Sequence, residues 1–279
     1  MSGFSPEWLA LREPVDHRSR DARLAGQLAA RFAGRGSVRV VDLGCGTGSN
    51  LRGTFHLLPD EQHWTLVDYD PRLLAAARDA IAAWSDRHET TGDALTVYKH
   101  GKSLRVRFRQ ADLNADLDGA LGSETDLITA SAFFDLCSAA FIERFATAVA
   151  TRNTVFFTVL TYNGEQQWTP AHAADAEMLA AFHAHQVSDK GFGPSAGPGA
   201  AEALRSAFEG AGYDVHEGDS PWTMDDADRR LIAELASGFA GAVAETGEVD
   251  TATIAQWAAV TRTAAIVGHT DTLALPGHG

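Results

Sequence analysis

Two periods of apolar residues alternate along the chain, one typical of buried β-strands and the other of amphipathic helices. Residues 37–43 are rich in valine, as expected for a strand that is buried on both faces of a parallel sheet. Similar short apolar runs predict strands at 64–68, 126–131 and 154–161. Because helical patterns separate these runs, the sequence predicts βαβ units with right-handed crossovers.

The helical patterns place apolar residues three or four positions apart. One of them runs from Asp16 to Gly34, before the first strand, with Leu24, Leu28 and Phe32 on its apolar face. Another follows Asp70-Pro71, two residue types that suit an N-cap and a first helical position. The remaining predicted elements are helices at 49–58, around 141–149, around 178–182, at 200–210, 225–245 and 251–261, a hairpin at 94–110, and strands at 213–217 and 264–274, the last interrupted by the polar step 268–271.

The chain shows no internal repeat and no low-complexity linker, so we expect its 279 residues to form a single domain. A stretch dense in glycine and proline, residues 189–199, predicts a loop with special backbone angles. Within the domain we expect an N-terminal helical segment at 1–36, a ligand-binding half at 37–161, an insertion that caps the site at 162–199, and C-terminal strands and helices at 200–279.

The charge balance argues against a nucleic-acid partner. The net charge is −14, so a phosphate backbone is repelled on average. The densest cationic cluster, from Lys99 to Arg109, falls in the predicted hairpin, and we interpret its alternating arginines as a solvated sheet edge. No apolar run reaches membrane-spanning length, and the N-terminus lacks the pattern of a signal peptide. We therefore expect a soluble, cytoplasmic protein with no membrane partner.

The two cysteines, Cys45 and Cys137, are too few for a disulfide framework and indicate a reducing compartment. Neither has the Cys/His spacing of a zinc site, so no metal is expected.

The strongest chemical signal is the stretch Val40–Asn50, in which a strand ends in closely spaced glycines and a helix begins. Such a turn lets the backbone approach a ligand closely at the carboxyl edge of a parallel sheet. The glycines, Gly44, Gly46 and Gly48, depart from the G-x-G-x-x-G spacing of dinucleotide-binding proteins.

The segment Asp42–Gly48 resembles the first motif of class I S-adenosylmethionine-dependent methyltransferases. Val67–Pro71 resembles the end of that family's second strand, where a carboxylate, here Asp68, accepts both ribose hydroxyls of the cofactor. Gln110–Leu113 resembles the adenine-contacting corner, and Asp126–Ser131 resembles the strand whose end faces the methionine part. The resemblance implies S-adenosylmethionine as the cofactor and, as its contacts, Asp42, Gly44, Cys45, Gly46, Gly48, Asn50, Asp68, Tyr69, Asp112, Leu113 and Ser131.

The resemblance also implies a fold, an α/β Rossmann-like one. Its sheet is largely parallel and seven-stranded, with helices on both faces, an antiparallel last strand and, in this chain, a helical cap insertion. The implied reaction is in-line displacement that moves a methyl group to an oxygen, nitrogen or carbon atom. The chain lacks the Pro-Pro motif of adenine methylation in nucleic acid and the Pro-Cys context of cytosine methylation. With the acidic charge, this favours a small-molecule acceptor.

The acceptor side is expected at the carboxyl edge of the sheet and in the insertion. His269 lies in the polar step of the last strand, and an imidazole that titrates near neutrality suits a general base; a structural histidine is the alternative. His185, near the glycine-rich loop, is the second catalytic candidate. The residues expected to bind the acceptor are Tyr162, Asp189, Lys190 and Trp222, with the core as the alternative for Trp222; Lys190 suits an acidic substrate, and Phe192 can cover it.

Two other functions fit the same fold. An aminopropyltransferase uses a decarboxylated form of the cofactor and needs acidic residues after the fourth strand, where the chain offers Asp135. A non-catalytic cofactor-binding regulator or partner subunit would keep the motifs without turnover. A tRNA or protein methyltransferase has no basic groove in its favour, and the sequence leaves the oligomeric state open.

Overall fold

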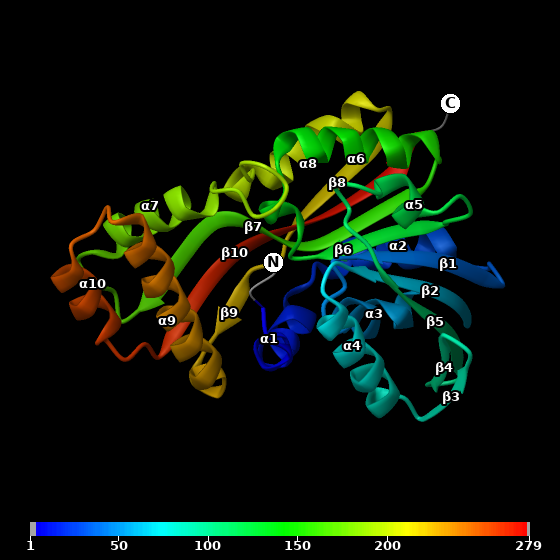
Figure 1. Cartoon of the computed structure of the whole chain (residues 1–279), viewed down its shortest axis with the longest axis horizontal. Coiled ribbons are helices and arrows are strands. Elements are labelled where there is room, and N and C mark those ends of the chain that lie inside the picture. The colour runs from blue at the N-terminus through cyan, green and yellow to red at the C-terminus, as the bar shows by residue number, and fades with distance from the viewer. Residues whose placement is uncertain (1–3, 278–279) are drawn as a thin grey trace.

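A mixed sheet of ten strands runs through the part of the chain that the computed structural model describes, residues 4–277 (Figure 1). The strand order is β3-β4-β5-β2-β1-β6-β7-β10-β8, and β9 pairs with β10 beside this path. The strands are β1 Ser37–Leu43, β2 Glu61–Asp68, β3 Arg87–Thr91, β4 Ala94–Lys99, β5 Lys102–Gln110, β6 Leu127–Ser131, β7 Val155–Thr169, β8 Tyr213–Asp219, β9 Trp222–Met224 and β10 Ala264–Pro276.

The centre of the sheet is parallel. Strands β5, β2, β1, β6 and β7 are parallel to one another, whereas β4 is antiparallel to β5 and β10 is antiparallel to both β7 and β8. The sheet is larger than the seven strands expected, because the hairpin β3–β4 extends it beyond β5 and β9 adds a short strand on β10. The carboxyl ends of the parallel strands therefore meet at one edge, where ligands of open α/β sheets bind.

The helices are α1 Pro6–Ser19, α2 Ala22–Phe32, α3 Ser49–Thr54, α4 Pro71–Trp84, α5 Leu117–Leu121, α6 Ala139–Thr151, α7 Asp175–Gln186, α8 Ala200–Gly210, α9 Arg229–Thr246 and α10 Thr251–Ala258. Short 3₁₀ turns occur at η1 Phe55–Leu57, η2 Phe134–Leu136, η3 Gly197–Gly199 and η4 Asp226–Asp228. Asp70 caps α4 as expected, since its side chain accepts a hydrogen bond from the Arg72 N–H at 2.8 Å.

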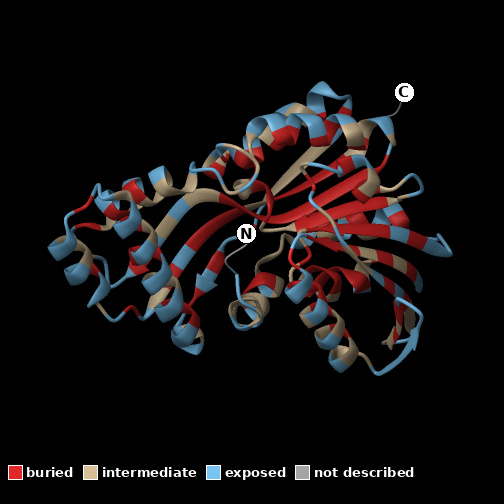
Figure 2. Ribbon diagram, in the orientation of Figure 1, coloured by how far each residue is buried: buried red, intermediate tan, exposed pale blue. Residues whose placement is uncertain are grey.

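Each face of the sheet has its own apolar cluster, and Figure 2 shows the buried residues concentrated on the strands and on the helix sides that face them. One cluster joins the sheet to α2, α3 and α4, and it continues into the distal helices. The other joins the opposite face to α5, α6 and α8. The two clusters fix the strand ends that carry the predicted motifs.

The N-terminal segment differs from the single helix expected at 16–34. It forms two helices, because Arg20 takes an extended conformation at the end of α1 and the Asp21 side chain caps α2 through the Leu24 N–H at 2.7 Å. The start of α1 carries its own signal, with Ser5 as N-cap and Pro6 as first helical residue.

Strands β7 and β10 are also longer than expected. β7 continues past 161 to Thr169, and β10 runs through the polar step 268–271, which the structure accommodates as irregularities in the register. The extended ends of the two strands carry α7, α9 and α10, which lie together at one end of the molecule (Figure 1). Among the described residues, no helix is both long enough and apolar enough to cross a membrane.

Candidate functional site

The glycine turn follows β1 at the carboxyl edge of the sheet. Gly44, Gly46 and Gly48 have φ angles of 60°, 52° and 78°, a region that glycine enters without strain. A Cβ atom at Gly44 would lie 2.6 Å from a ring carbon of Phe133, and one at Gly48 would lie 2.8 Å from Ile81 Cδ1. Glycine is therefore required at both positions by conformation and by space.

Asp68, at the end of β2, holds the turn. Its Oδ2 accepts a hydrogen bond from the Gly46 N–H and its Oδ1 accepts one from the Asp70 N–H, both at 2.9 Å. Burial raises the pKa of Asp68, and these two hydrogen bonds oppose the shift. Each carboxylate oxygen keeps a lone pair for a further donor. The residue thus fits the predicted contact with two hydroxyl groups.

Asp42 and Asn50 lie beneath the turn and are buried. Asn50 Nδ2 donates to Asp42 Oδ1 at 2.8 Å and to Thr129 Oγ1 at 3.0 Å, and its Oδ1 accepts from Arg20 and Thr54. Burial raises the pKa of Asp42 to about 7. The geometry gives both residues a supporting position under the turn, and Asp42 Oδ2 remains buried without a hydrogen-bond partner among the described residues.

The other predicted cofactor contacts differ in their surroundings. Tyr69 is 57% exposed beside Asp68, so its ring is free to stack on a planar ligand. Asp112 is exposed, and one of its oxygens accepts from the Asn114 N–H at 2.9 Å. By contrast, Leu113 is buried in the apolar cluster of α5, α6 and α8.

Cys45 and Ser131 complete the predicted set. Ser131 is half-buried at the end of β6. Cys45 is buried, and burial raises its pKa well above the ordinary thiol value, so it stays a neutral thiol. Its backbone N–H donates to the Val67 carbonyl at 3.0 Å and so ties the turn to β2.

Helix α1, which the sequence patterns did not predict, lies against the glycine turn. Leu9 Cδ1 is 3.0 Å from where a Cβ at Gly46 would stand. Glu13 pairs with Arg52 through two oxygens, at 2.7 and 2.5 Å, and Arg52 Nη1 donates to the Thr47 carbonyl at 2.9 Å. The helix is therefore coupled to the backbone of the turn.

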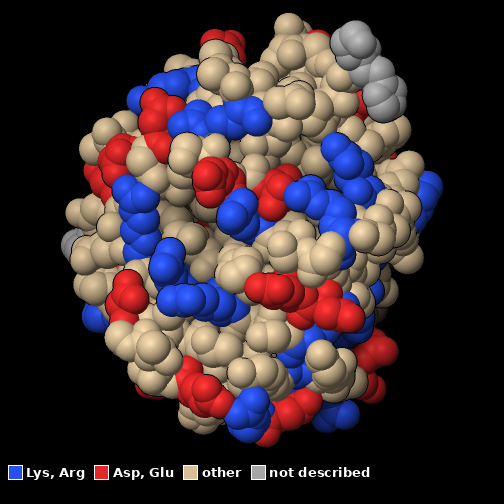
Figure 3. Space-filling view, turned by 90° about the vertical axis from the view of Figure 1, so that its right-hand side faces the viewer, with Lys and Arg blue, Asp and Glu red and all other residues tan. Residues whose placement is uncertain are grey.

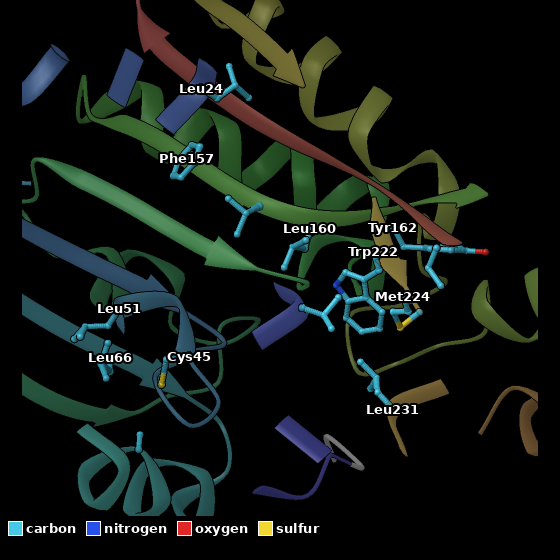
Figure 4. Packing of buried hydrophobic residues seen from close by; sticks show 14 of the residues in the cluster. Leu24, Cys45, Leu51, Leu66, Phe157, Leu160, Tyr162, Trp222, Met224 and Leu231 are labelled. Atoms are coloured by element: carbon cyan, nitrogen blue, oxygen red, sulfur yellow. The ribbon is translucent and has the colours of Figure 1, made fainter. Parts of the chain in front are cut away.

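The acceptor side lies where β7, β10 and α7 meet. The Tyr162 hydroxyl is 3.1 Å from His183 Nε2, and the ring centroids of Tyr162 and His269 are 6.2 Å apart. His269 also packs against Trp222 at a centroid distance of 5.1 Å. Figure 4 shows Tyr162, Trp222 and Met224 close together, with Cys45 of the glycine turn on the other side of the view. The structure thus gathers Tyr162, Trp222 and His269 of the predicted acceptor residues.

Arg12 and Asp16 of α1 border the same group. Trp222 Nε1 donates to Asp16 Oδ1 at 3.0 Å, and Arg12 pairs with the other oxygen of Asp16 at 2.9 Å. The Arg12 guanidinium lies 5.1 Å from the centre of the Trp222 ring. Trp222 itself is buried in the apolar cluster, so it packs and donates a hydrogen bond rather than standing open.

Asp135, in η2 after β6, faces this group. Burial raises its pKa to about 6, while its own backbone N–H and the charge of Arg12 oppose the shift. Burial raises the pKa of Tyr162, and the charge of Asp135 adds to that shift. The Asp135 Oδ1 atom is buried without a hydrogen-bond partner in the described part of the chain. Such an orphaned oxygen can accept a hydrogen bond from a bound molecule.

On the sequence alone, His269 is a candidate general base because an imidazole ordinarily titrates near neutrality. In the structure the pKa of His269 lies well below that range. Burial, and then the charge of Arg12, lower its pKa to about 3. The imidazole is therefore neutral at physiological pH and too weak a base to hold a proton there. Its buried Nδ1 has no hydrogen-bond partner among residues 4–277 and can still hydrogen-bond to a ligand.

The remaining candidates lie apart from this group. His185 Nε2 lies 3.0 Å from Glu245 Oε2 of α9, in a partly exposed hydrogen-bonding contact. Asp189 Oδ1 accepts from the N–H groups of Gly191 and Gly193, so it shapes its own loop. Lys190 is half-buried in that loop.

The glycine-rich loop reaches the cofactor side instead. The Gly191 carbonyl accepts a hydrogen bond from Asn114, and Phe192 packs on Phe133 at a centroid distance of 5.6 Å and on Phe141 at 4.7 Å. Phe192 thus covers Phe133, whose ring lies next to Gly44, and not the group of acceptor-side residues.

Arg12 and His183 were missed as acceptor-side residues, and Asp135 was considered only for the aminopropyltransferase alternative. Asp135 follows the fourth strand directly, which is a signal, but Arg12 depends on the undetected helix α1 and His183 depends on how α7 packs. Among residues 4–277, no group of three or more His, Cys, Asp or Glu side chains is arranged to hold a metal ion.

No protein-family model and no curated protein matches the sequence. Solved structures of similar fold do exist. A cyclopropane-fatty-acyl-phospholipid synthase-like protein from Lactobacillus casei ATCC 334 has a TM-score of 0.54 at 14% identity, over 94% of this chain and 91% of that one. A provisionally named methyltransferase from Bacillus halodurans C-125 has a TM-score of 0.51 at 11% identity, over 91% and 99%.

A cyclopropane synthase from Mycobacterium tuberculosis gives a TM-score of 0.50 at 12% identity, over 97% of this chain and 94% of that chain. At these identities the likeness concerns the fold, on which different substrates can be handled. It agrees with the resemblance that the four motifs indicate. The chain therefore shares its fold with these methyltransferase-type and cyclopropane synthase structures.

Proposed function

We propose that the protein binds S-adenosylmethionine and methylates an oxygen, nitrogen or carbon atom of a small molecule. The observation that carries this proposal is the geometry of Asp68. Its carboxylate is fixed to the glycine turn by one hydrogen bond per oxygen, and both oxygens keep a lone pair. Two neighbouring acceptors suit the two hydroxyls of a ribose, and the exposed Tyr69 ring beside them suits the adenine face.

The bound sulfonium group supplies a methyl group that is already activated. The chain then needs to align the acceptor, exclude water and take up a proton where the acceptor carries one. Asp135 is the residue that we propose for the proton, because its pKa of about 6 leaves it mostly ionised at neutral pH and its Oδ1 is free to accept. Tyr162 and the neutral His269 then orient the acceptor by hydrogen bonds.

The chemistry balances with these groups alone. The acceptor atom forms a bond to the methyl carbon as the carbon–sulfur bond breaks, and the thioether keeps that electron pair. The acceptor's proton passes to Asp135. In such a reaction Asp68 and the glycine turn would hold the cofactor, and Tyr162 would border the acceptor.

Calorimetry with S-adenosylhomocysteine tests the cofactor assignment. We expect saturable binding by the unmodified protein and at least a tenfold loss of affinity in Asp68→Asn, because an amide keeps only one of the two acceptor oxygens. Asp60→Asn is the matched control. Asp60 is an exposed carboxylate that lies away from the turn, and its Oδ1 is 3.0 Å from Lys102 Nζ. Absence of binding by the unmodified protein, or equal losses in both variants, contradicts the proposal.

Incubation of a metabolite extract with the protein and methyl-labelled cofactor separates the alternatives. Labelled products support methyl transfer. Transfer of an aminopropyl group from the decarboxylated cofactor would instead identify an aminopropyltransferase; Asp135 is a single carboxyl, whereas a polyamine carries several positive charges. Cofactor binding without any labelled product would favour the non-catalytic regulator.

A further inference from the structure

The arginines of β5 do not lie at a sheet edge, as their alternation suggested. β5 pairs with β2 on one side and with β4 on the other, so Arg105 and Arg107 stand on a face inside the sheet. In the register, Arg39 of β1 lies beside His63 of β2, and His63 lies beside Arg105. The next row along the same face ends in Arg107.

This face is bare because the segment between β5 and β6 forms only one short helix. α5 has five residues, Leu117–Leu121, and it meets β5 at the end of that strand, where Arg109 donates a hydrogen bond to the Gly119 carbonyl. A groove beside it is lined by Thr65 of β2 and by Arg105 and Arg107 of β5. On the opposite face of the sheet, α4 covers β2 and β5. That face is apolar, and Leu104 and Val106 of β5 belong to its buried cluster. The sequence thus places arginine where a longer crossover helix would require apolar residues.

The bare face forms a groove of about 360 Å³. Val41 and Thr65 stand in its centre, and Gly119, Ala120 and Gly122 form the rim on the side of α5. Its charged lining consists of one glutamate, Glu124, and four arginines, Arg39, Arg105, Arg107 and Arg109. Figure 3 views the molecule from the side where these strands begin and shows several Lys and Arg side chains close together among acidic ones.

The pairing of these arginines is uneven. Arg109 pairs with Asp116 at 2.7 Å, and Arg39 lies 3.6 Å from Glu124 in an exposed contact. Arg105 and Arg107 are exposed, and neither has an ion pair or hydrogen bond within residues 4–277. Arg105 and Arg107 lie two residues apart on β5, about 6.6 Å along the strand, so these unpaired cations repel one another unless an anion lies between them. In a chain of net charge −14, such a concentration is local and specific.

We infer that this groove binds a compact anion with several phosphate groups, such as the polyphosphate part of a nucleotide. Guanidinium groups bind phosphate oxygens in a planar, two-bond geometry, and two of them about 6.6 Å apart on one strand can contact adjacent phosphates. The groove has the size of a small-molecule site. It does not continue as a basic track, because Asp116, Asp118 and Glu124 lie before, within and after α5, and this disfavours a nucleic-acid strand.

The test measures the binding of sodium tripolyphosphate to the full chain by calorimetry, at low and at physiological salt. We expect saturable binding that weakens with salt, and at least tenfold weaker binding of inorganic phosphate, which makes fewer contacts. The double variant Arg105→Gln/Arg107→Gln should bind tripolyphosphate at least tenfold more weakly. The matched control is Arg229→Gln/Arg230→Gln, which removes two exposed arginines from α9 and should change the affinity less than twofold.

Unchanged thermal midpoints show that both double variants are folded. Absence of saturable binding, or equal losses in the two double variants, overturns the inference. A single-stranded 20-nucleotide DNA that binds at least tenfold more tightly than tripolyphosphate also overturns it, in favour of a nucleic-acid surface. None of these outcomes depends on whether the protein binds S-adenosylhomocysteine, which is measured separately.

Discussion

The residue scale decides whether the glycine turn can form. Gly44 combines a positive φ with a Cβ position that Phe133 already fills. Gly44→Ala should therefore lower the thermal midpoint and abolish binding of S-adenosylhomocysteine, with a stability loss of about 1–3 kcal/mol. The matched control is Gly26→Ala, because Gly26 lies in α2 with nothing within 4 Å of its Cβ position. That variant should be more stable by about 0.5–1 kcal/mol. Equal effects of the two substitutions would contradict the account of the turn.

Asp135 gives methyl transfer a pH dependence with a definite sign. A carboxyl whose pKa is about 6 must lose its proton to act as a base, so the rate should rise as the pH increases through 6 and then level off. Asp135→Asn should remove this rise and slow transfer at pH 7.5 by at least tenfold, while the affinity for S-adenosylhomocysteine changes less than twofold. The assay is label incorporation into the extract product; Asp79→Asn, an exposed helix residue, is the control. A rise near pH 6 that persists in Asp135→Asn would assign it to another group.

The same pKa shift affects stability in the opposite direction. The folded protein binds the Asp135 proton more tightly than the unfolded chain, whose aspartates titrate near 3.9. The resulting stabilisation is fully present below about pH 4 and is lost as the pH rises through 6. At neutral pH the ionised form of Asp135, which is the form that acts as a base, therefore makes the folded protein less stable than it is below pH 4.

Residue types at strand ends were predictable from the sequence because local geometry dictates them. The positive φ angles require the glycines, and the end of β2 requires the carboxylate that holds the turn. The environments of Asp135 and His269 were not predictable in this way. Their pKa values depend on burial and on Arg12, which comes from a helix more than a hundred residues away in the chain.

At the scale of elements, α1 is the part that the sequence patterns missed. Its apolar residues pack on the turn and on the acceptor side at once, so it has no single apolar stripe. The signal that was available is the Ser5-Pro6 start, since serine caps and proline begins helices. Helices with one buried face, such as α2 and α4, were placed from periodicity alone.

The pair of Glu13 with Arg52 should fix α1 to the turn. Arg52 is 7% exposed in its side chain, so Glu13→Ala leaves a nearly buried cation without its partner and should cost about 3 kcal/mol. Because Arg52 also holds the Thr47 carbonyl, the affinity for S-adenosylhomocysteine should fall as well. Denaturant unfolding and calorimetry measure the two effects. Glu7→Ala on the same helix, an exposed position, should stay within about 0.5 kcal/mol of the unmodified protein. A change no larger in Glu13→Ala would show that α1 is held by apolar contacts.

At the scale of the whole molecule, the long strands β7 and β10 join two functional regions. The cofactor motifs lie on or after β1, β2, β5 and β6, whereas Tyr162 and His269 lie where β7 and β10 leave the central sheet for the distal helices. The parallel half follows rules that sequence periodicity captures. The distal half does not, because the extra length of β7 and the packing of α7 on α9 depend on contacts between segments far apart in the chain.

This arrangement predicts that the two regions can be loosened separately. Trp257 is fully buried against Trp168 and Phe239, at centroid distances of 5.3 and 5.1 Å, and its Nε1 donates to Asp175 of α7 at 2.7 Å. Trp257→Ala should cost about 3–5 kcal/mol and speed hydrogen exchange in α7, α9 and α10, while β1, β2 and β6 stay protected. Since Tyr162 bonds to His183 of α7, methyl transfer should slow more than S-adenosylhomocysteine binding weakens.

Phe145→Ala is the matched cavity in the other cluster. Phe145 is fully buried between α6 and the sheet, against Phe134 and Phe156 at centroid distances of 4.9 and 5.0 Å. This variant should lose protection in α6 and α8 and leave the distal helices unchanged, at a similar cost in stability. If both variants instead speed exchange everywhere to the same extent, the molecule opens as one cooperative unit, and the acceptor side cannot be loosened without the cofactor site.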